Sequence, residues 1–125
     1  MEYEIFVEEV NRLDFVNDRA TADAAVKAVL GILASRLSEP KAQRLTEKLP
    51  GPLEYDRLRG LQARPLELSV DEYVQNIARQ FHLNEAQAAR LIIQVLHFTK
   101  DAIGVDKEEL KSELPYDWAD LIDGA

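Results

Sequence analysis

The chain contains no cysteine among its 125 residues. Disulfide bonds, thiolate nucleophiles and cysteine-ligated zinc or iron–sulfur centres are therefore excluded. Long apolar runs are also missing, because the longest, at residues 91–93 and 95–96, is far shorter than the roughly 20 residues that a bilayer crossing needs. The chain starts Met-Glu-Tyr-Glu, which is acidic where a secretion signal would be basic. We therefore expect a soluble, unexported protein of the cytoplasm.

Basic residues are scarce relative to acidic ones. The chain has 15 Lys and Arg against 23 Asp and Glu, which gives a formal net charge of −8. Binding to nucleic acid draws most of its affinity from Lys and Arg contacts with phosphate, and anionic lipid surfaces attract basic segments in the same way. We therefore expect no nucleic-acid partner and no membrane partner for this acidic chain.

The usual signatures of catalysis are missing as well. The five glycines do not cluster into a loop that could cradle a phosphate, and no Gly-x-Ser-x-Gly elbow is present. His97 and Asp101 stand four residues apart, a spacing at which two helical side chains can share a metal ion. A zinc site needs three or four ligands, however, and the only other histidine, His82, precedes that helix. We therefore predict no enzymatic activity, no cofactor and no metal site, with His97 and Asp101 on a solvated helix face.

What the sequence does contain is an internal duplication of apolar residues. Val29 returns 66 positions later as Val95 (95 − 29 = 66), and the Leu-Pro pair ending at Pro50 returns at Pro115. The order and spacing of apolar residues persist while the polar residues between them differ, which indicates that packing constrains the segment. With 46% hydrophobic residues, the chain is long enough for one shared core. We predict a single domain over residues 1–125. It contains two repeats, at about 3–58 and 68–123, joined by a linker at about 59–67.

Each repeat has the pattern of three helices followed by a short terminal turn. The predicted helices lie at residues 4–13, 19–37 and 40–49, and again at residues 70–81, 84–103 and 106–114. Ser69 with Glu72, and Asn84 with Gln87, form capping boxes that mark two helix starts. The long helices carry a wide apolar face, so we expect them to lie at the centre and to pack on each other. The predicted fold class is all-α, a helical bundle built from two pseudo-symmetric repeats of about three helices each.

Two residues interrupt the apolar pattern of the long helices. Gly31 lies inside a helix, where glycine costs about 1 kcal/mol relative to alanine. Either an exposed position or a close approach by another helix would account for it. Thr99 stands among apolar residues, and its hydroxyl can donate to a carbonyl oxygen in the preceding turn.

The ordered set of motifs resembles a known family. Each repeat has an aromatic-led first helix, at residues 6–10 and 73–77, and the first repeat has Asp18-Arg19 shortly before Ala22. Together with the Leu-Pro endings, these motifs resemble the bacterial family catalogued as domain of unknown function 2267, over almost the whole chain. The resemblance implies an all-α fold with a doubled helical unit, and it implies no established activity. The second repeat has His-Leu-Asn at residues 82–84 in place of the Asp-Arg pair, so a site built on that pair would exist at most once.

Three arginines form the most basic stretch of the chain. Arg57, Arg59 and Arg64 lie in residues 57–66, which contain no acidic residue. Guanidinium groups on a loop can clamp a phosphate or a carboxylate, so these residues are candidate anion or partner contacts. The alternative is internal pairing with acidic residues near the other end of the chain, which are Glu108, Glu109, Glu113, Asp117, Asp120 and Asp123.

Two aromatic residues near the end of the chain are candidate interface residues. Tyr116 and Trp118 stand in a short amphipathic segment with acidic neighbours. Tryptophan and tyrosine dominate interface hot spots, which favours a partner-binding anchor. Large aromatic residues also commonly close a core, and the sequence leaves both interpretations open.

Two functions are compatible with these patterns. The first is a non-catalytic protein-interaction or scaffold module of the bacterial cytoplasm, whose partner is a protein, either another copy or a different chain. The alternative is a small-molecule or anion-binding protein with a pocket between the two repeats, in which Arg57, Arg59 and Arg64 supply the polar contacts. A cleft between duplicated halves is a common place for a ligand, so we keep the binding of a small molecule as the alternative function.

Overall fold

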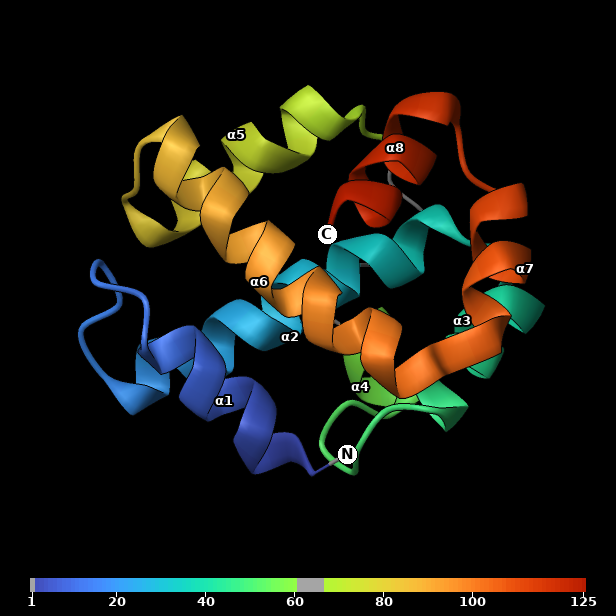
Figure 1. Ribbon diagram of the computed structural model, residues 1–125, viewed down its shortest axis with the longest axis horizontal. Coiled ribbons are helices and arrows are strands. Elements are labelled where there is room, and N and C mark those ends of the chain that lie inside the picture. Colours follow the sequence, from blue (N-terminus) through green and yellow to red (C-terminus); the bar gives the residue numbers. More distant parts are fainter. Residues whose placement is uncertain (1, 61–66) are drawn as a thin grey trace.

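The computed structural model describes residues 2–60 and 67–125, and these residues form helices without any strand (Figure 1). The predicted all-α class is therefore confirmed. In chain order the elements are α1 (Tyr3–Asn11), α2 (Arg19–Arg36), α3 (Glu39–Glu47), α4 (Tyr55–Gly60), α5 (Val70–Phe81), α6 (Glu85–Ile103), the 3₁₀ turn η1 (Gly104–Asp106), α7 (Lys107–Ser112) and α8 (Tyr116–Gly124).

Side-chain caps determine where three of the helices begin. The Ser69 hydroxyl accepts a hydrogen bond from the Glu72 backbone N–H at 3.1 Å, and the Glu72 carboxylate accepts one from the Ser69 N–H. Asn84 and Gln87 make the same reciprocal pair at the start of α6. Asp18 caps α2 by accepting from the Thr21 N–H at 2.7 Å. Both predicted capping boxes are confirmed, since both hydrogen bonds of each box are present. Each box satisfies backbone donors that would otherwise lack a partner.

Other boundaries differ from the sequence-based prediction. α1 ends at Asn11 rather than at residue 13, and the helix predicted from residue 106 is divided into η1 and the shorter α7. The terminal segments, predicted as turns, form the helices α4 and α8. α4 continues to Gly60, so the first two residues of the predicted linker are helical. The rest of that linker, up to residue 66, lies outside the described residues.

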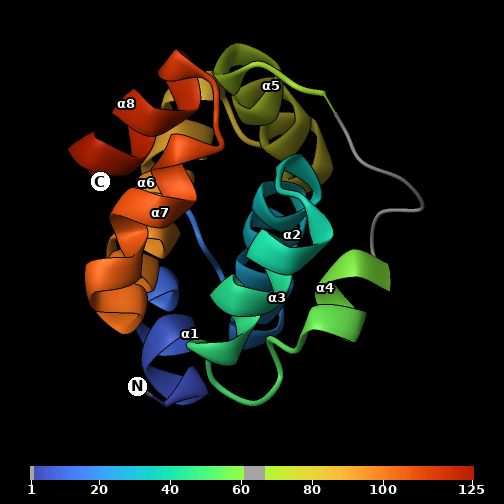
Figure 2. The same cartoon turned by 90° about the vertical axis from the view of Figure 1, so that its right-hand side faces the viewer.

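α2 is the central helix of the bundle. Every residue from Ala28 to Ser35 is buried, so the helix is covered on all sides rather than along one stripe. It packs against α1, α3, α4, α5 and α6, and Figure 2 shows it with these neighbours around it. Gly31 lies in the fully buried part, so the interpretation of Gly31 as a tolerated exposed residue is wrong.

α6 is the second long helix, and it keeps one apolar face. Its buried residues include Leu91, Ile92, Val95 and Leu96, whereas Ile93 remains partly exposed. α6 packs on α2, which confirms the expectation that the two long helices contact each other. The hydroxyl of Thr99 donates to the Val95 carbonyl at 2.8 Å, as predicted for a polar residue in this stripe.

The parts of the chain before and after residues 61–66 interlock. α1 packs on α2 and also on α6, while α5 packs on α6 and also on α2 (Figure 1). The rings of Phe6 and Phe98 meet edge to face with centroids 6.3 Å apart. The buried hydroxyl of Tyr73 donates to the Val29 carbonyl at 2.7 Å, which links α5 to the middle of α2. One hydrophobic cluster consequently contains side chains from both parts of the chain.

Candidate functional site

The two candidate interface aromatics occupy opposite environments, although both belong to α8. Trp118 is fully buried, its ring stacks on Tyr73 with centroids 4.6 Å apart, and its indole N–H donates to the Leu68 carbonyl at 2.8 Å. Trp118 therefore closes the core and is not offered to a partner. Tyr116, at the start of α8, is 85% exposed.

The three candidate arginines are placed only in part. The backbones of Arg57 and Arg59 form part of α4. Their side chains, and all of Arg64, lie outside the part of the chain that the structure describes. Several acidic residues proposed as their partners have other described contacts. Glu109 pairs with cations of α3, and Asp117 accepts a hydrogen bond from the Val70 N–H at 2.9 Å.

His97 and Asp101 both lie on the exposed side of α6. The His97 ring nitrogen Nδ1 lies 3.0 Å from the carbonyl oxygen of Ala125. Among the residues that the structure describes, no group of three or more histidines and carboxylates is placed to hold a metal ion.

A ligand-sized cleft lies between the α1–α2 turn and the α5–α6 turn, which Figure 1 shows on the same side of the molecule. Its volume is about 300 Å³. Six of its nine lining residues are apolar or aromatic, three are polar, and none is an aspartate, glutamate, lysine or arginine. The lining residues are Phe15, Val16, Asn17, Thr21, Ala25, Phe81, His82, Leu83 and Leu91.

The lining of this cleft follows the 66-residue spacing noted in the sequence. Pairs of lining residues are separated by the same 66 positions that separate Val29 from Val95, and these pairs are Phe15 with Phe81, Val16 with His82, Asn17 with Leu83, and Ala25 with Leu91. The helix caps that end the two turns, Asp18 and Asn84, have the same separation. The two turns separated by 66 positions therefore face one cleft. Because the residues at paired positions differ, one turn contributes Asn17 and the other contributes His82.

His82 has an unusual backbone conformation in this cleft. It ends α5 with φ 56° and ψ 46°, and within the described part of the chain it is the one non-glycine residue with positive φ. Histidine adopts this left-handed region more readily than most residues do. The conformation ends α5 sharply, so that Leu83 and the Asn84 cap follow at once and α6 starts beside the cleft.

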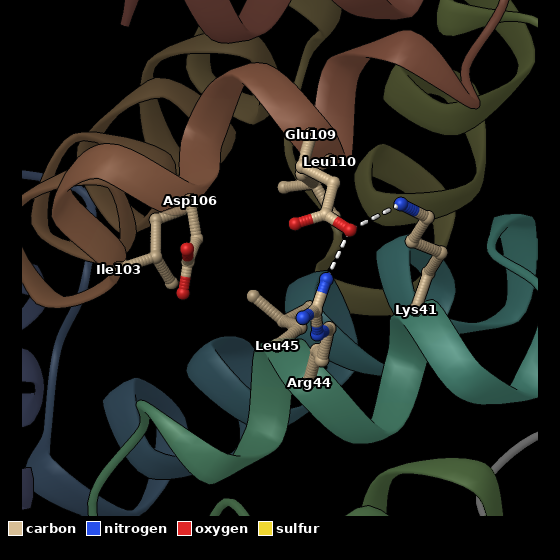
Figure 3. Close-up of a pocket in the computed structure, with 7 residues that line it drawn as sticks. All are labelled: Lys41, Arg44, Leu45, Ile103, Asp106, Glu109 and Leu110. Atoms are coloured by element: carbon tan, nitrogen blue, oxygen red, sulfur yellow. Dashed lines mark hydrogen bonds and ion pairs between the residues drawn. The ribbon is translucent and has the colours of Figure 1, made fainter.

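A second hollow lies between α3 and the η1–α7 segment, where charged side chains span the two (Figure 3). Lys41 Nζ lies 2.8 Å from Glu109 Oε1, and Arg44 bonds the same carboxylate oxygen. The hydrogen bond from Lys41, together with the charge of Arg44, lowers the pKa of the Glu109 carboxyl below its ordinary value. Lys48 and Asp106 add a longer ion pair at 3.8 Å.

Apolar side chains lie beneath these charges. The gap is lined by Leu45 of α3, Ile103 of α6 and Leu110 of α7, together with the charged residues above them. Its volume is only about 20 Å³, which is the space of about one water molecule. Figure 3 shows Leu45 and Leu110 directed into the space between the two segments, with the Glu109 carboxylate between Lys41 and Arg44.

Comparison with known proteins identifies the family. The family model described as uncharacterized conserved protein (DUF2267) matches residues 3–121. The chain belongs to this family. The resemblance inferred from the ordered motifs is thereby confirmed. No curated protein and no solved structure matches the chain. Within the described residues, no helix combines the length and the apolar character that a membrane crossing requires.

Sequence reasoning allowed for a pocket between the two halves of the chain, but it did not identify the residues that line either hollow. Five of the nine cleft residues stand in two turns that have no helical period, and the others lie in the helices next to these turns. The available signal was the separation of 66 positions that most of them share. The charged contacts between α3 and α7 join Lys41 and Arg44 to a carboxylate more than sixty positions away, and no local pattern marks such a pair.

Proposed function

We propose that this protein binds a small, largely uncharged molecule in the cleft between the α1–α2 and α5–α6 turns. The observation that supports this proposal is a concave space of about 300 Å³ formed by two corresponding turns. Small-molecule sites start at about this size, and a cavity of about half the volume holds benzene. A ligand of one or two rings is the right size.

The lining supports a neutral ligand. Phe15 and Phe81 supply aromatic surface, while Asn17, Thr21 and His82 supply hydrogen-bond donors and acceptors to the same cleft. The lining contains no Lys or Arg that could pair with an anion and no Asp or Glu that could pair with a cation. The proposal therefore keeps the expected ligand between the two halves and replaces the arginine contacts with a lining whose polar and apolar surfaces are about equal.

Thermal unfolding with a set of neutral aromatic and aliphatic fragments tests the proposal. A ligand at about a hundredfold excess over its Kd stabilises the folded state by about 2.7 kcal/mol, which raises the Tm of a domain of this size by several degrees. Asn17→Trp is expected to fill the cleft and to abolish this shift. Asn11→Trp places the same side chain at an exposed position away from the cleft and serves as the matched control.

Two results would contradict ligand binding in the cleft. One is a Tm that no fragment raises at millimolar concentration. The other is a fragment that raises the Tm of wild type and of Asn17→Trp equally, because this ligand would be bound elsewhere.

An interaction module is the second candidate, and one observation favours it. Tyr116 is 85% exposed beside Asp117 and Asp120 on α8, and exposed tyrosine is enriched at interface hot spots. Sedimentation velocity over a wide concentration range tests self-association, with Tyr116→Ser as the interface variant. Self-association that Tyr116→Ser weakens supports the module, and a wild-type monomer at every concentration removes a second copy as its partner.

A further inference from the structure

The gap between α3 and η1–α7 combines two features that are needed to hold an amphipathic anion. Lys41 and Arg44, one turn apart on α3, converge on a single carboxylate oxygen of Glu109. Below them lie Leu45 and Leu110, whose side chains are apolar (Figure 3). Two cations over an apolar surface can hold the carboxylate head and the hydrocarbon tail of one molecule.

We propose that this gap is a second ligand site, for a small aliphatic carboxylate, and that Glu109 occupies the head-group position when no ligand is bound. The site shares no residue with the cleft of the proposed function, so the two proposals stand independently. Glu109 marks the position of the head group because it already places a carboxylate oxygen within hydrogen-bond reach of both cations.

Replacing Glu109 costs little. Its side chain is 42% exposed and that of Arg44 is 59% exposed, and exposed ion pairs contribute little to stability. A ligand carboxylate would take over the same two cations, so neither Lys41 nor Arg44 would lose its partner. The released Glu109 would turn to solvent, where water solvates its charge. The affinity for the ligand must therefore come mainly from its hydrocarbon tail.

The tail needs more space than the present gap of about 20 Å³, so α7 must move away from α3. Each of the two helices packs more extensively on other neighbours than on the other helix. α3 packs closely on α2 and α4, and α7 packs closely on α8 and η1, whereas polar side chains join α3 to α7. Ser38 adds one more such link, through its hydroxyl, to Glu113 at 3.0 Å.

Gly104 provides the joint for the movement. It ends α6 with φ 57° and ψ −122°, a conformation that glycine adopts at little cost and other residues avoid. A Cβ atom placed on Gly104 would meet nothing within 4 Å, so the joint lies in open space. Rotation about Gly104 would carry η1 and α7 away from α3 and widen the gap above Leu45.

Calorimetric titration with acetate, butanoate, hexanoate and octanoate at constant ionic strength tests the proposal. Glu109→Gln removes the internal competitor and is expected to bind octanoate roughly fivefold more tightly than wild type. Each added methylene should raise affinity by about fourfold while the tail fits the gap. Octanol, which has the tail without the charge, is expected to bind Glu109→Gln more weakly than octanoate does, because only a carboxylate can pair with the two cations that this variant frees.

Matched variants locate the site. Glu108→Gln makes the same change one position away on α7, where the carboxylate pairs with Lys111 of the same helix, and it should leave the affinity for octanoate at the wild-type value. The double variant Lys41→Ala/Arg44→Ala should abolish binding, and Asn17→Trp should leave it unchanged. If the double variant does not fold, as judged by circular dichroism, the comparison of Glu109→Gln with Glu108→Gln decides.

Three results would overturn the proposal. They are no octanoate binding by wild type or Glu109→Gln at millimolar concentration, equal octanoate affinities of Glu109→Gln and Glu108→Gln, and binding of octanol to Glu109→Gln as tight as that of octanoate. Loss of octanoate binding in Asn17→Trp would also overturn it, because the ligand would then occupy the other cleft.

Discussion

The buried hydroxyl of Tyr73 provides a sharp test of how this core is held together. It donates to the Val29 carbonyl at 2.7 Å across the α5–α2 contact, and the residue is fully buried. Tyr73→Phe removes one hydroxyl group and keeps the ring that stacks on Trp118. A hydrogen bond of this kind contributes a net 0.5–1.5 kcal/mol, so we predict a loss of about 1 kcal/mol in the free energy of unfolding at neutral pH.

The pH dependence makes the prediction more specific. Burial raises the pKa of the Tyr73 hydroxyl well above its ordinary value of 10.0. A group with a raised folded-state pKa contributes stability that is complete below the unfolded-state pKa and is lost as the pH rises through the folded-state value. Above about pH 10, wild type therefore loses stability through Tyr73 and Tyr73→Phe does not. The difference between the two proteins should shrink and then reverse in sign.

Urea unfolding at a series of pH values measures this difference. With an m value of about 2 kcal/mol/M, a loss of 1 kcal/mol lowers the midpoint by about 0.5 M urea at neutral pH. Tyr116→Phe is the matched control, because Tyr116 is 85% exposed, and its midpoint should not change. Burial also raises the pKa of Tyr3. Tyr3 is present in wild type and in both variants, so it does not cause a difference between them. Equal midpoints for the two variants, or a difference that does not vary with pH, would refute the reasoning.

Three further changes have expected outcomes. Trp118→Ala should cost about 3–5 kcal/mol in urea unfolding, because it leaves a core cavity and removes the donor to the Leu68 carbonyl, and Trp118→Phe should cost less. Ser69→Ala should cost about 1 kcal/mol by removing the cap of α5, and a loss below 0.3 kcal/mol would contradict a structural role for the capping box. Glu109→Gln should unfold at less urea than wild type at pH 7, and the difference should vanish as the pH falls through the lowered pKa of Glu109, because a protonated Glu109 has lost its ion pairs.

The helices that could be predicted are those whose start is determined locally. α5 and α6 begin where the capping boxes of Ser69 and Asn84 indicate, because these caps need only side chains within the same turn. The short helices α4 and α8 were predicted as turns, because a helix of so few residues is marginal on its own and depends on packing. For α8 that packing is the stack of Trp118 on Tyr73, which is a contact between distant segments.

The sites were harder to predict than the fold for a related reason. The apolar period of α2 predicts one buried stripe, but α2 is buried on all sides because five other helices pack around it. The cleft exists only because two turns far apart in the chain meet, and the α3–α7 ion pairs exist only because α7 turns back at Gly104. Composition and local periodicity carry no information about such meetings between distant segments, so the sequence favoured the arginines at 57, 59 and 64 instead.

The interlocked packing has a consequence for synthesis of the chain. α1 needs α6 to cover its apolar face, and Phe6 meets Phe98 only after 92 further residues have been made (98 − 6 = 92). A growing chain therefore has α2 but not α6 to cover the apolar face of α1 until most of the chain has been made. For the same reason, a fragment that stops at residue 60 would expose apolar surface and is expected to aggregate rather than fold.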